Sequence, residues 1–169
     1  MSEQFAFINY WNDHHPDHQV RYYNHLSEFT LDDEKIMQLM QGADIATVAW
    51  AASDGSARAI AVPFALLDDE VYFTAEASQP IVKSLEGDNR ISMCWGGMIG
   101  AATARGHAEI IDDQDLTARV CEASAKQRYQ NDADKAAKLA SRLASPTRVS
   151  IKVTADKHIT FSTLGLPRD

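Results

Sequence analysis

Residues 45–74, IATVAWAASDGSARAIAVPFALLDDEVYFT, decide the fold of this chain. Residues 45–51 are rich in Ala, Val, Ile and Thr, a composition typical of a β-strand. Asp54-Gly55 predicts a hairpin turn because glycine readily adopts positive φ. Residues 59–67 predict a second strand, Asp68-Asp69 a second turn, and residues 71–74 a short third strand. Three strands joined by tight turns indicate an antiparallel meander.

Upstream of this stretch the apolar residues recur at helical spacing. Residues 20–29 predict one helix, and residues 30–42 predict another. Thr30 has the chemistry of an N-cap and Gly42 that of a helix stop.

Downstream, Ser78 and Pro80 have the chemistry of a helix start, and the short helix they begin should end near Gly87. Strands are expected over residues 90–95 and 101–111, with Gly96 and Gly97 as a break between them. Asp112-Asp113 should cap a helix that runs to about residue 129, and a further helix is expected over residues 135–143. Two last strands follow over residues 147–153 and 158–161. This order predicts a mainly β barrel with helical additions rather than a βαβ repeat.

The composition fits one domain of 169 residues. We expect a helical N-terminal extension (1–43), a barrel (44–111 and 147–162) and a helical insertion (112–145). The net charge of −8 argues against nucleic-acid binding, which needs basic side chains. The absence of a long apolar run argues against a membrane span. With Cys94 and Cys121 as its only cysteines, the chain is expected to be reduced and cytoplasmic.

Several segments occur in an order that resembles the pyridoxamine 5′-phosphate oxidase-like family of FMN-binding split β-barrels. The segments that carry this resemblance are residues 45–48 before Asp54-Gly55, 58–63, 71–85, 89–93, 105–109 and 147–151. The resemblance implies a six-stranded antiparallel split barrel that forms a homodimer, with FMN in the grooves between the subunits.

The resemblance also implies the cofactor site. Arg58 and the strand after it would line the cofactor, hydroxyl groups and Lys83 would face its phosphate, and Trp95 with the strand beyond it would come from the other subunit. The implied cofactor-binding residues are Arg58, Ala59, Ile60, Ala61, Phe73, Thr74, Ser78, Gln79, Lys83, Trp95, Ala101 and Thr103. Family members usually carry Arg or Lys directly after the position of Ser78, where this chain has Gln79 and Pro80. The substrate-phosphate residues of true pyridoxamine phosphate oxidases are not recognisable either.

The expected function is therefore FMN-dependent oxidoreduction of an unidentified small molecule. No catalytic residue stands out, because the flavin itself transfers the hydride or electrons. Two alternatives stay open: a flavin-binding or stress-response module without turnover, and a split barrel that holds haem or the deazaflavin F420. Haem would need an axial histidine, for which His107 and His158 are the candidates.

Some further residues resemble functional groups, but the sequence pattern does not favour a functional role for them. His14, His15 and His18 resemble a metal cluster, but Pro16 interrupts the segment and a polar loop is expected, with no metal. His107 is expected to lie on a solvated strand face, together with Arg105 and Glu109. Cys94, between Met93 and Trp95, is expected to be a buried, inert thiol.

Overall fold

The computed structural model describes residues 30–97 and 100–162. The histidine segment near the N-terminus and the expected helix over residues 20–29 lie outside this part of the chain. The described helices are α2 (Asp33–Gly42), α3 (Pro80–Gly87), α4 (Gln114–Arg128) and α5 (Ala133–Leu143). The described strands are β1 (Ala46–Ala51), β2 (Ala57–Val62), β3 (Phe64–Leu67), β4 (Glu70–Glu76), β5 (Arg90–Gly97), β6 (Gly100–Ile111) and β7 (Arg148–Ser162).

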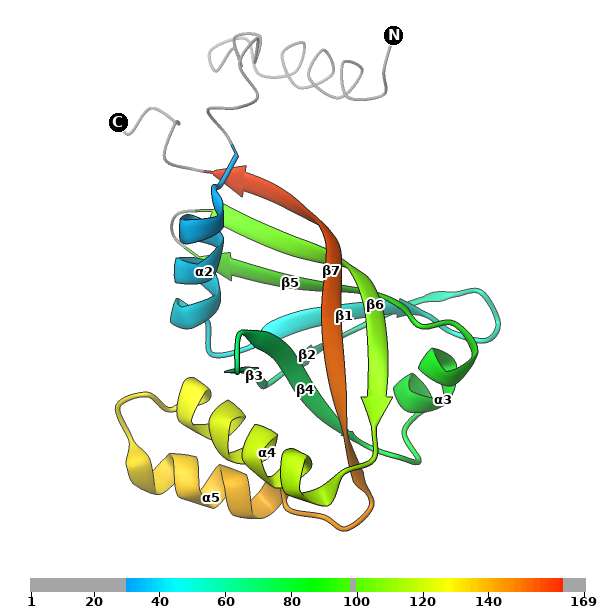
Figure 1. Cartoon of the computed structure of the whole chain (residues 1–169), viewed down its shortest axis with the longest axis vertical. Coiled ribbons are helices and arrows are strands. Elements are labelled where there is room, and N and C mark those ends of the chain that lie inside the picture. The colour runs from blue at the N-terminus through cyan, green and yellow to red at the C-terminus, as the bar shows by residue number, and fades with distance from the viewer. Residues whose placement is uncertain (1–29, 98–99, 163–169) are drawn as a thin grey trace, which may run out of the picture.

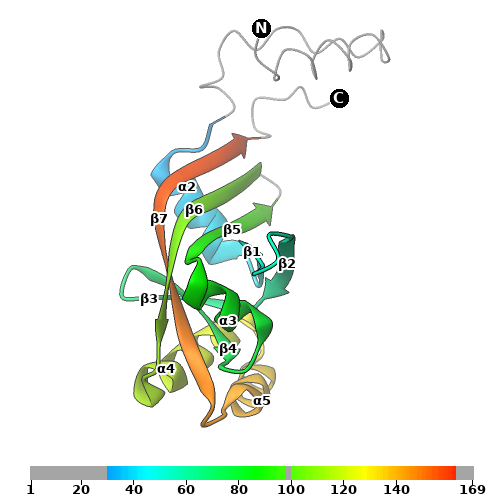
Figure 2. The ribbon, with the colours of Figure 1, turned by 90° about the vertical axis from the view of Figure 1, so that its right-hand side faces the viewer.

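All of these strands join one antiparallel sheet in the order β2-β1-β5-β6-β7-β4-β3. The sheet curls strongly, so that its ends approach each other (Figures 1 and 2). The strands at its two edges, β2 and β3, are separated in the chain by Pro63 alone. The mainly β split barrel expected from the sequence is confirmed.

The number of strands differs from the expected six. The run expected as one strand over residues 59–67 is divided at Pro63, which has no N–H for a continuing ladder. Conversely, the two strands expected after residue 147 form one strand, β7, whose pairing with β6 shifts register between Arg105 and Gly106. Gly96 and Gly97 do not end the fourth strand but lie within β5.

Two helix starts differ from expectation and one agrees with it. Asp32, rather than Thr30, caps α2, and its side chain accepts a hydrogen bond from the Lys35 backbone N–H at 2.9 Å. Gln79, rather than Ser78, occupies the N-cap position of α3 and makes no side-chain cap. Asp113 caps α4 as expected, accepting from the Leu116 N–H at 3.0 Å.

The core lies inside the curled sheet. Val48, Phe73, Met93 and Ile151 are fully buried there, and α2 and α3 add their own apolar residues to the same cluster. A second, smaller cluster lies on the outer face, where α4 packs on β3 and β4. The α4–α5 pair therefore covers one half of the outer face.

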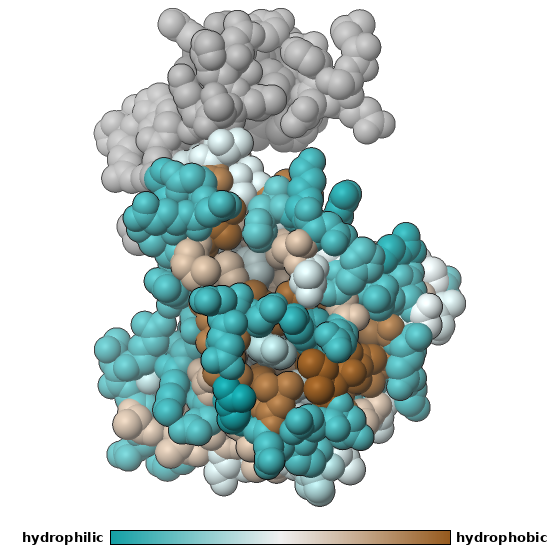
Figure 3. Space-filling model, viewed as in Figure 1, coloured by the Kyte–Doolittle hydropathy of each residue, from teal (hydrophilic) through white to brown (hydrophobic). Residues whose placement is uncertain are grey.

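On the other half, alternate residues of β1, β2, β5 and β6 point outward and are mostly small or polar. The outward positions include Ala49, Ala59, Ser92 and Thr103, which burial alternation and register place on one face. Figure 3 shows one side of the molecule, where hydrophobic side chains remain visible among hydrophilic ones. Among the described helices, none is both long and apolar enough to cross a membrane.

Candidate functional site

The edge strand β2 is the most exposed strand that the sequence analysis singled out. From Ala57 to Ala61 every residue is exposed, and Ile60 keeps 42% of its surface open. Among the described strands β2 pairs only with β1, so one side of its backbone has no partner from this part of the chain. An edge strand of this kind offers N–H and C=O groups to another chain or a ligand. Four implied cofactor residues, Arg58 to Ala61, thus lie together.

Arg58 is held at the hairpin end of β2. Its Nε donates to Ser56 Oγ at 3.1 Å, and its Nη2 lies 3.6 Å from the Asp54 carboxylate. Hydrogen bonds from Ser56 lower the pKa of Asp54, and the Arg58 charge lowers it further. The Arg58 side chain nevertheless remains 56% exposed. The guanidinium is oriented by its neighbours and still has N–H groups free for an anion.

Helix α3 supplies the other implied polar groups. Ser78, Gln79 and Lys83 are all exposed, and the Gln79 side chain makes no hydrogen bond to the helix end. The helix packs against β1, β4 and β6. Figure 1 places helix α3 on the same side of the barrel as the β1–β2 hairpin.

Three implied residues direct their side chains elsewhere. Phe73 is completely buried, and Trp95 is 1% exposed in the core beside Phe64. Thr74 lies beneath α4, where its hydroxyl accepts a hydrogen bond from Arg148 Nη1 at 3.2 Å. In this arrangement a cofactor could reach only the backbone of these residues.

The remaining implied residues, Ala101 and Thr103, lie half-buried on the outer face of β6. They are separated from β2 by β1 and β5. Cys94 is their cross-strand neighbour, paired with Thr103. It is half-buried on the same outer face rather than in the core as expected. This group fits the implied contribution to a second subunit rather than to the β2 site of its own chain.

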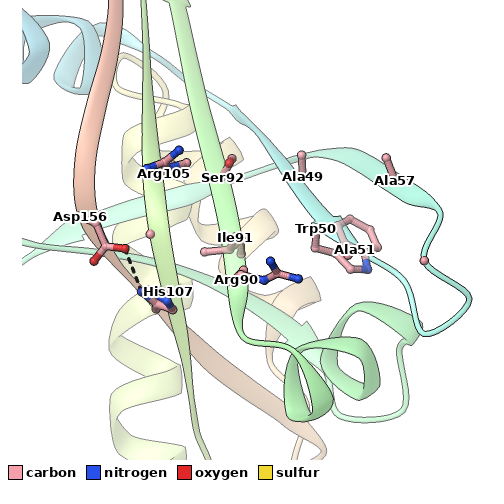
Figure 4. Close-up of a pocket in the computed structure, with 12 residues that line it drawn as sticks. Ala49, Trp50, Ala51, Ala57, Arg90, Ile91, Ser92, Arg105, His107 and Asp156 are labelled. Carbon is pink, nitrogen blue, oxygen red and sulfur yellow. Dashed lines mark ion pairs between the residues drawn. The ribbon is translucent and has the colours of Figure 1, made fainter.

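A groove of about 640 Å³ lies beside the β1–β2 hairpin. Figure 4 shows its labelled residues, which come from β1, β2, β5, β6 and β7. Small residues and Trp50 form the β1–β2 side, and mainly polar side chains of β5, β6 and β7 form the rest. The lining residues are Ala49, Trp50, Ala51, Gly55, Ala57, Arg90, Ile91, Ser92, Arg105, Gly106, His107 and Asp156.

Two side-chain contacts organise the polar side of this groove. His107 Nδ1 lies 3.0 Å from the Asp156 carboxylate. Arg90 is bonded to both carboxylate oxygens of Asp88, at distances down to 2.6 Å. Hydrogen bonds from Arg90 lower the pKa of Asp88 to about 2, with a smaller contribution from His107. His107 is exposed, as expected from the sequence.

The indole N–H of Trp50, which also lines the groove, is buried without a hydrogen-bond partner among the described residues. Trp50 is the cross-strand neighbour of Arg58. A buried donor without an acceptor costs free energy, so it marks a place where a bound group could be accommodated. No local sequence feature distinguishes Trp50 from an ordinary packing aromatic.

The sequence analysis did not connect Arg90, Arg105, His107 and Asp156 into a site. The alternation of residues along a strand predicts that Arg105 and His107 share one face of β6. The contribution of Asp156 depends on the pairing of β6 with β7, across about fifty residues of chain that include two helices. No local sequence feature predicts this register between β6 and β7.

Comparison with known proteins agrees with the architecture. The family model described as pyridoxamine 5′-phosphate oxidase matches residues 32–161. Among curated proteins no significant match is found.

Several solved structures share the fold. The conserved hypothetical protein Rv2991 from Mycobacterium tuberculosis has a TM-score of 0.73 at 19% identity, covering 85% of this chain and 93% of that one. An F420 reductase has a TM-score of 0.55 at 19% identity, covering 72% and 94%. The general stress protein 26 from Bacillus anthracis has a TM-score of 0.56 at 18% identity, covering 76% and 92%. With a family model matched over most of its length, this chain belongs to the pyridoxamine 5′-phosphate oxidase-like family of split barrels.

Proposed function

We propose that this protein is an FMN-dependent oxidoreductase that works as a homodimer. The observation that carries the proposal is the exposed edge strand β2, which bears Arg58 at its hairpin end, taken together with the uncapped start of α3. Family membership supports the same assignment. The substrate is an unidentified small molecule, and the expected setting is the cytoplasm.

The residues present fit the chemistry of this cofactor. Arg58, Ser78 and Lys83 are exposed donors suited to a dianionic phosphate, and Gln79 adds an amide where relatives carry a cation. The unpaired backbone of Ala59 to Ala61 can hydrogen-bond to the polar edge of a flavin ring. The unpartnered Trp50 indole N–H, across from Arg58, is a further donor on the same side. FMN, when bound, would supply the hydride or electron transfer.

The proposed homodimer uses the uncovered half of the outer face. Ile159 and Phe161 are 54% and 48% exposed at one end of it. Ala101 pairs with Phe161 and Thr103 with Ile159, so the four form one patch on β6 and β7. Large exposed apolar groups gathered in this way are typical of subunit contacts. In the dimer, Ala101 and Thr103 would face the cofactor groove of the partner subunit.

The first test is the affinity of purified protein for FMN, measured by quenching of flavin fluorescence. Arg58→Ala should weaken binding by about 1.5–3 kcal/mol, the usual range for a charge-assisted hydrogen bond. Arg142→Ala, which removes an exposed cation on α5, is the matched control and should leave affinity unchanged. Full affinity in Arg58→Ala would remove Arg58 from the site.

F420 is the second candidate cofactor, favoured by the likeness to an F420 reductase. Both molecules present a phosphate and a tricyclic ring to the same donors. The absorption spectrum and the mass of any molecule released on denaturation separate them. Release of haem would instead support the axial-histidine alternative. Turnover of bound flavin with a reductant distinguishes the enzyme from a flavin-binding module.

A further inference from the structure

A pocket of about 470 Å³ lies between the C-terminal end of α2 and the loop that joins α4 to α5. Figure 1 shows this loop below the lower end of α2. Among the described residues, no strand lines the pocket, and it shares no residue with the groove beside the β1–β2 hairpin. It is therefore separate from the proposed flavin site and from the sheet face of the proposed homodimer.

The two sides of this pocket are joined by glutamine side chains. Gln127 Nε2 donates to the carbonyl oxygens of Met40 at 2.8 Å and Ala43 at 3.0 Å. Gln130 Nε2 donates to the carbonyl oxygen of Gln41 at 2.8 Å. Carbonyl groups at a helix C-terminus lack partners within the helix, and these amides supply them. Since both sides are bonded to each other, the shape of the pocket between them is fixed.

The α2 side of the pocket is electronegative. The last turn of α2 has no basic residue, so the negative end of the helix dipole is not balanced by a charge of that turn. Asp44, just beyond the helix, is exposed and makes no ion pair with any described residue. Asp132, which also lines the pocket, is bonded to Lys135 at 2.8 Å. Asp44 is therefore the carboxylate that can receive a cationic group.

A cation lines the same pocket from the last turn of α4. Arg128 is half-buried there, and its guanidinium carbon lies 5.7 Å from the centre of the Tyr129 ring. Such a contact attracts the guanidinium to the ring and so orients it. Within residues 30–97 and 100–162, Arg128 has no carboxylate partner. Its planar set of N–H donors suits a carboxylate that comes from outside the chain.

Arg128 and Asp44 thus place opposite charges in one pocket, and the described structure does not pair them with each other. A small molecule that carries both a carboxylate and an ammonium group would provide a partner for each. The volume of about 470 Å³ is in the range of small-molecule sites.

From these observations we propose that the pocket binds a free amino acid with a polar side chain. Arg128 holds the α-carboxylate, and Asp44 together with the carbonyl end of α2 attracts the α-ammonium group. Asn131, which lines the pocket, and the Oε1 atom of Gln130 supply amide groups to the side chain of the ligand. The bound molecule would bridge α2 and the α4–α5 loop. This inference goes beyond the proposed flavin function and does not depend on it.

The test is isothermal titration calorimetry of the full-length protein with L-glutamine. Arg128→Gln should weaken binding roughly tenfold or more, because a charge-assisted contact to the carboxylate is lost. Arg128→Lys keeps the charge and should retain more affinity. Asp44→Asn should weaken binding by a smaller factor, since Asp44 is exposed.

The matched controls remove exposed charges elsewhere. Arg142→Gln on α5 and Glu86→Gln on α3 should bind L-glutamine as the wild type does. Arg58→Ala, which tests the flavin site, should do so as well, and the two proposals therefore fail independently. Circular dichroism verifies that each variant is folded.

Two analogues of L-glutamine separate the roles of its charges. 4-Carbamoylbutanoate lacks the ammonium group, and 4-aminobutanamide lacks the carboxylate. Both should bind at least tenfold more weakly than L-glutamine, and the weak binding of 4-aminobutanamide should not change in Arg128→Gln. No binding of L-glutamine by the wild type, binding insensitive to Arg128→Gln, or equal binding of the two analogues and L-glutamine would overturn the proposal.

Discussion

Gly106, which lines the groove beside the β1–β2 hairpin, is the residue on which the close approach of β6 and β7 depends most. A methyl group there would meet the Thr154 backbone, and a backbone atom cannot swing aside as a flexible side chain can. Gly106→Ala should therefore lower the free energy of unfolding by about 1–3 kcal/mol, the usual cost of forced overpacking. Urea denaturation measures this change.

Gly96→Ala is the matched control, because Gly96 also lies in a strand and has open space around its Cβ direction. It should be neutral or slightly stabilising, since alanine restricts the unfolded chain. Equal unfolding midpoints for the two variants would contradict the close contact between β6 and β7.

Among the elements, the connection from α5 to β7 is fastened to β4 by one carboxylate. Glu76 accepts hydrogen bonds from Ser145 at 3.1 Å and Thr147 at 2.7 Å, and it pairs with Arg148 at 2.9 Å. The Thr147 hydrogen bond, followed by those from Ser145 and Arg148, holds the pKa of Glu76 below its usual 4.5. This contact fixes the helical insertion on the sheet.

Glu76→Gln should lower the free energy of unfolding at pH 7 by about 1–3 kcal/mol, because the half-buried Arg148 loses its charged acceptor. A carboxylate with a lowered pKa in the folded state stabilises above its unfolded pKa, and this contribution is lost as the pH falls through the folded value. The difference between wild type and variant should therefore shrink below about pH 4.5.

Glu122→Gln provides the comparison for this effect. Glu122 forms an exposed pair with Lys126 on α4, a kind of pair that contributes little. Denaturation measured from pH 3 to 7 should show a small, nearly flat effect for Glu122→Gln. A pH-independent loss in Glu76→Gln would show that the carboxylate charge is not what matters.

Some features of the helices and strands can be predicted from local sequence patterns alone. Asp54-Gly55 forms its turn as predicted, with Gly55 at φ 80°, and Asp113 caps its helix. These features depend on neighbouring residues alone. The polar residues 154–157 suggested a gap between two strands, yet pairing with β6 carries β7 through them. The extended conformation of this segment is set by its pairing with β6, which the local sequence does not predict.

At the scale of the whole molecule, the dimer proposal predicts a change in assembly. Ile159→Lys places a charge within the exposed apolar patch and should weaken self-association roughly tenfold or more. Met37→Lys adds the same charge at an exposed position on α2 and should have no effect. Sedimentation velocity over a range of concentrations measures both. A wild-type monomer at micromolar concentration, or identical behaviour of the two variants, would contradict the dimer.

The candidate sites likewise combine features that the sequence predicts with features that depend on the complete fold. The likeness of segments such as residues 58–63 pointed to Arg58, which lies on an exposed strand, and its role at a cofactor stays a prediction. It did not show that Trp95 and Phe73 face the interior, because the inward or outward direction of a residue depends on strand register. Nor did it bring His107 to Asp156, since that contact needs the completed sheet.

The one-residue link at Pro63 has a consequence for aggregation. It joins the two edges of the sheet, β2 and β3, and so ties the barrel closed through the covalent chain instead of a hydrogen-bonded ladder. A circular permutant opened at Pro63 would free both edges to splay apart. Unprotected strand edges recruit other chains. Such a permutant should form fibrillar or amorphous aggregates at concentrations where the natural connectivity remains dispersed.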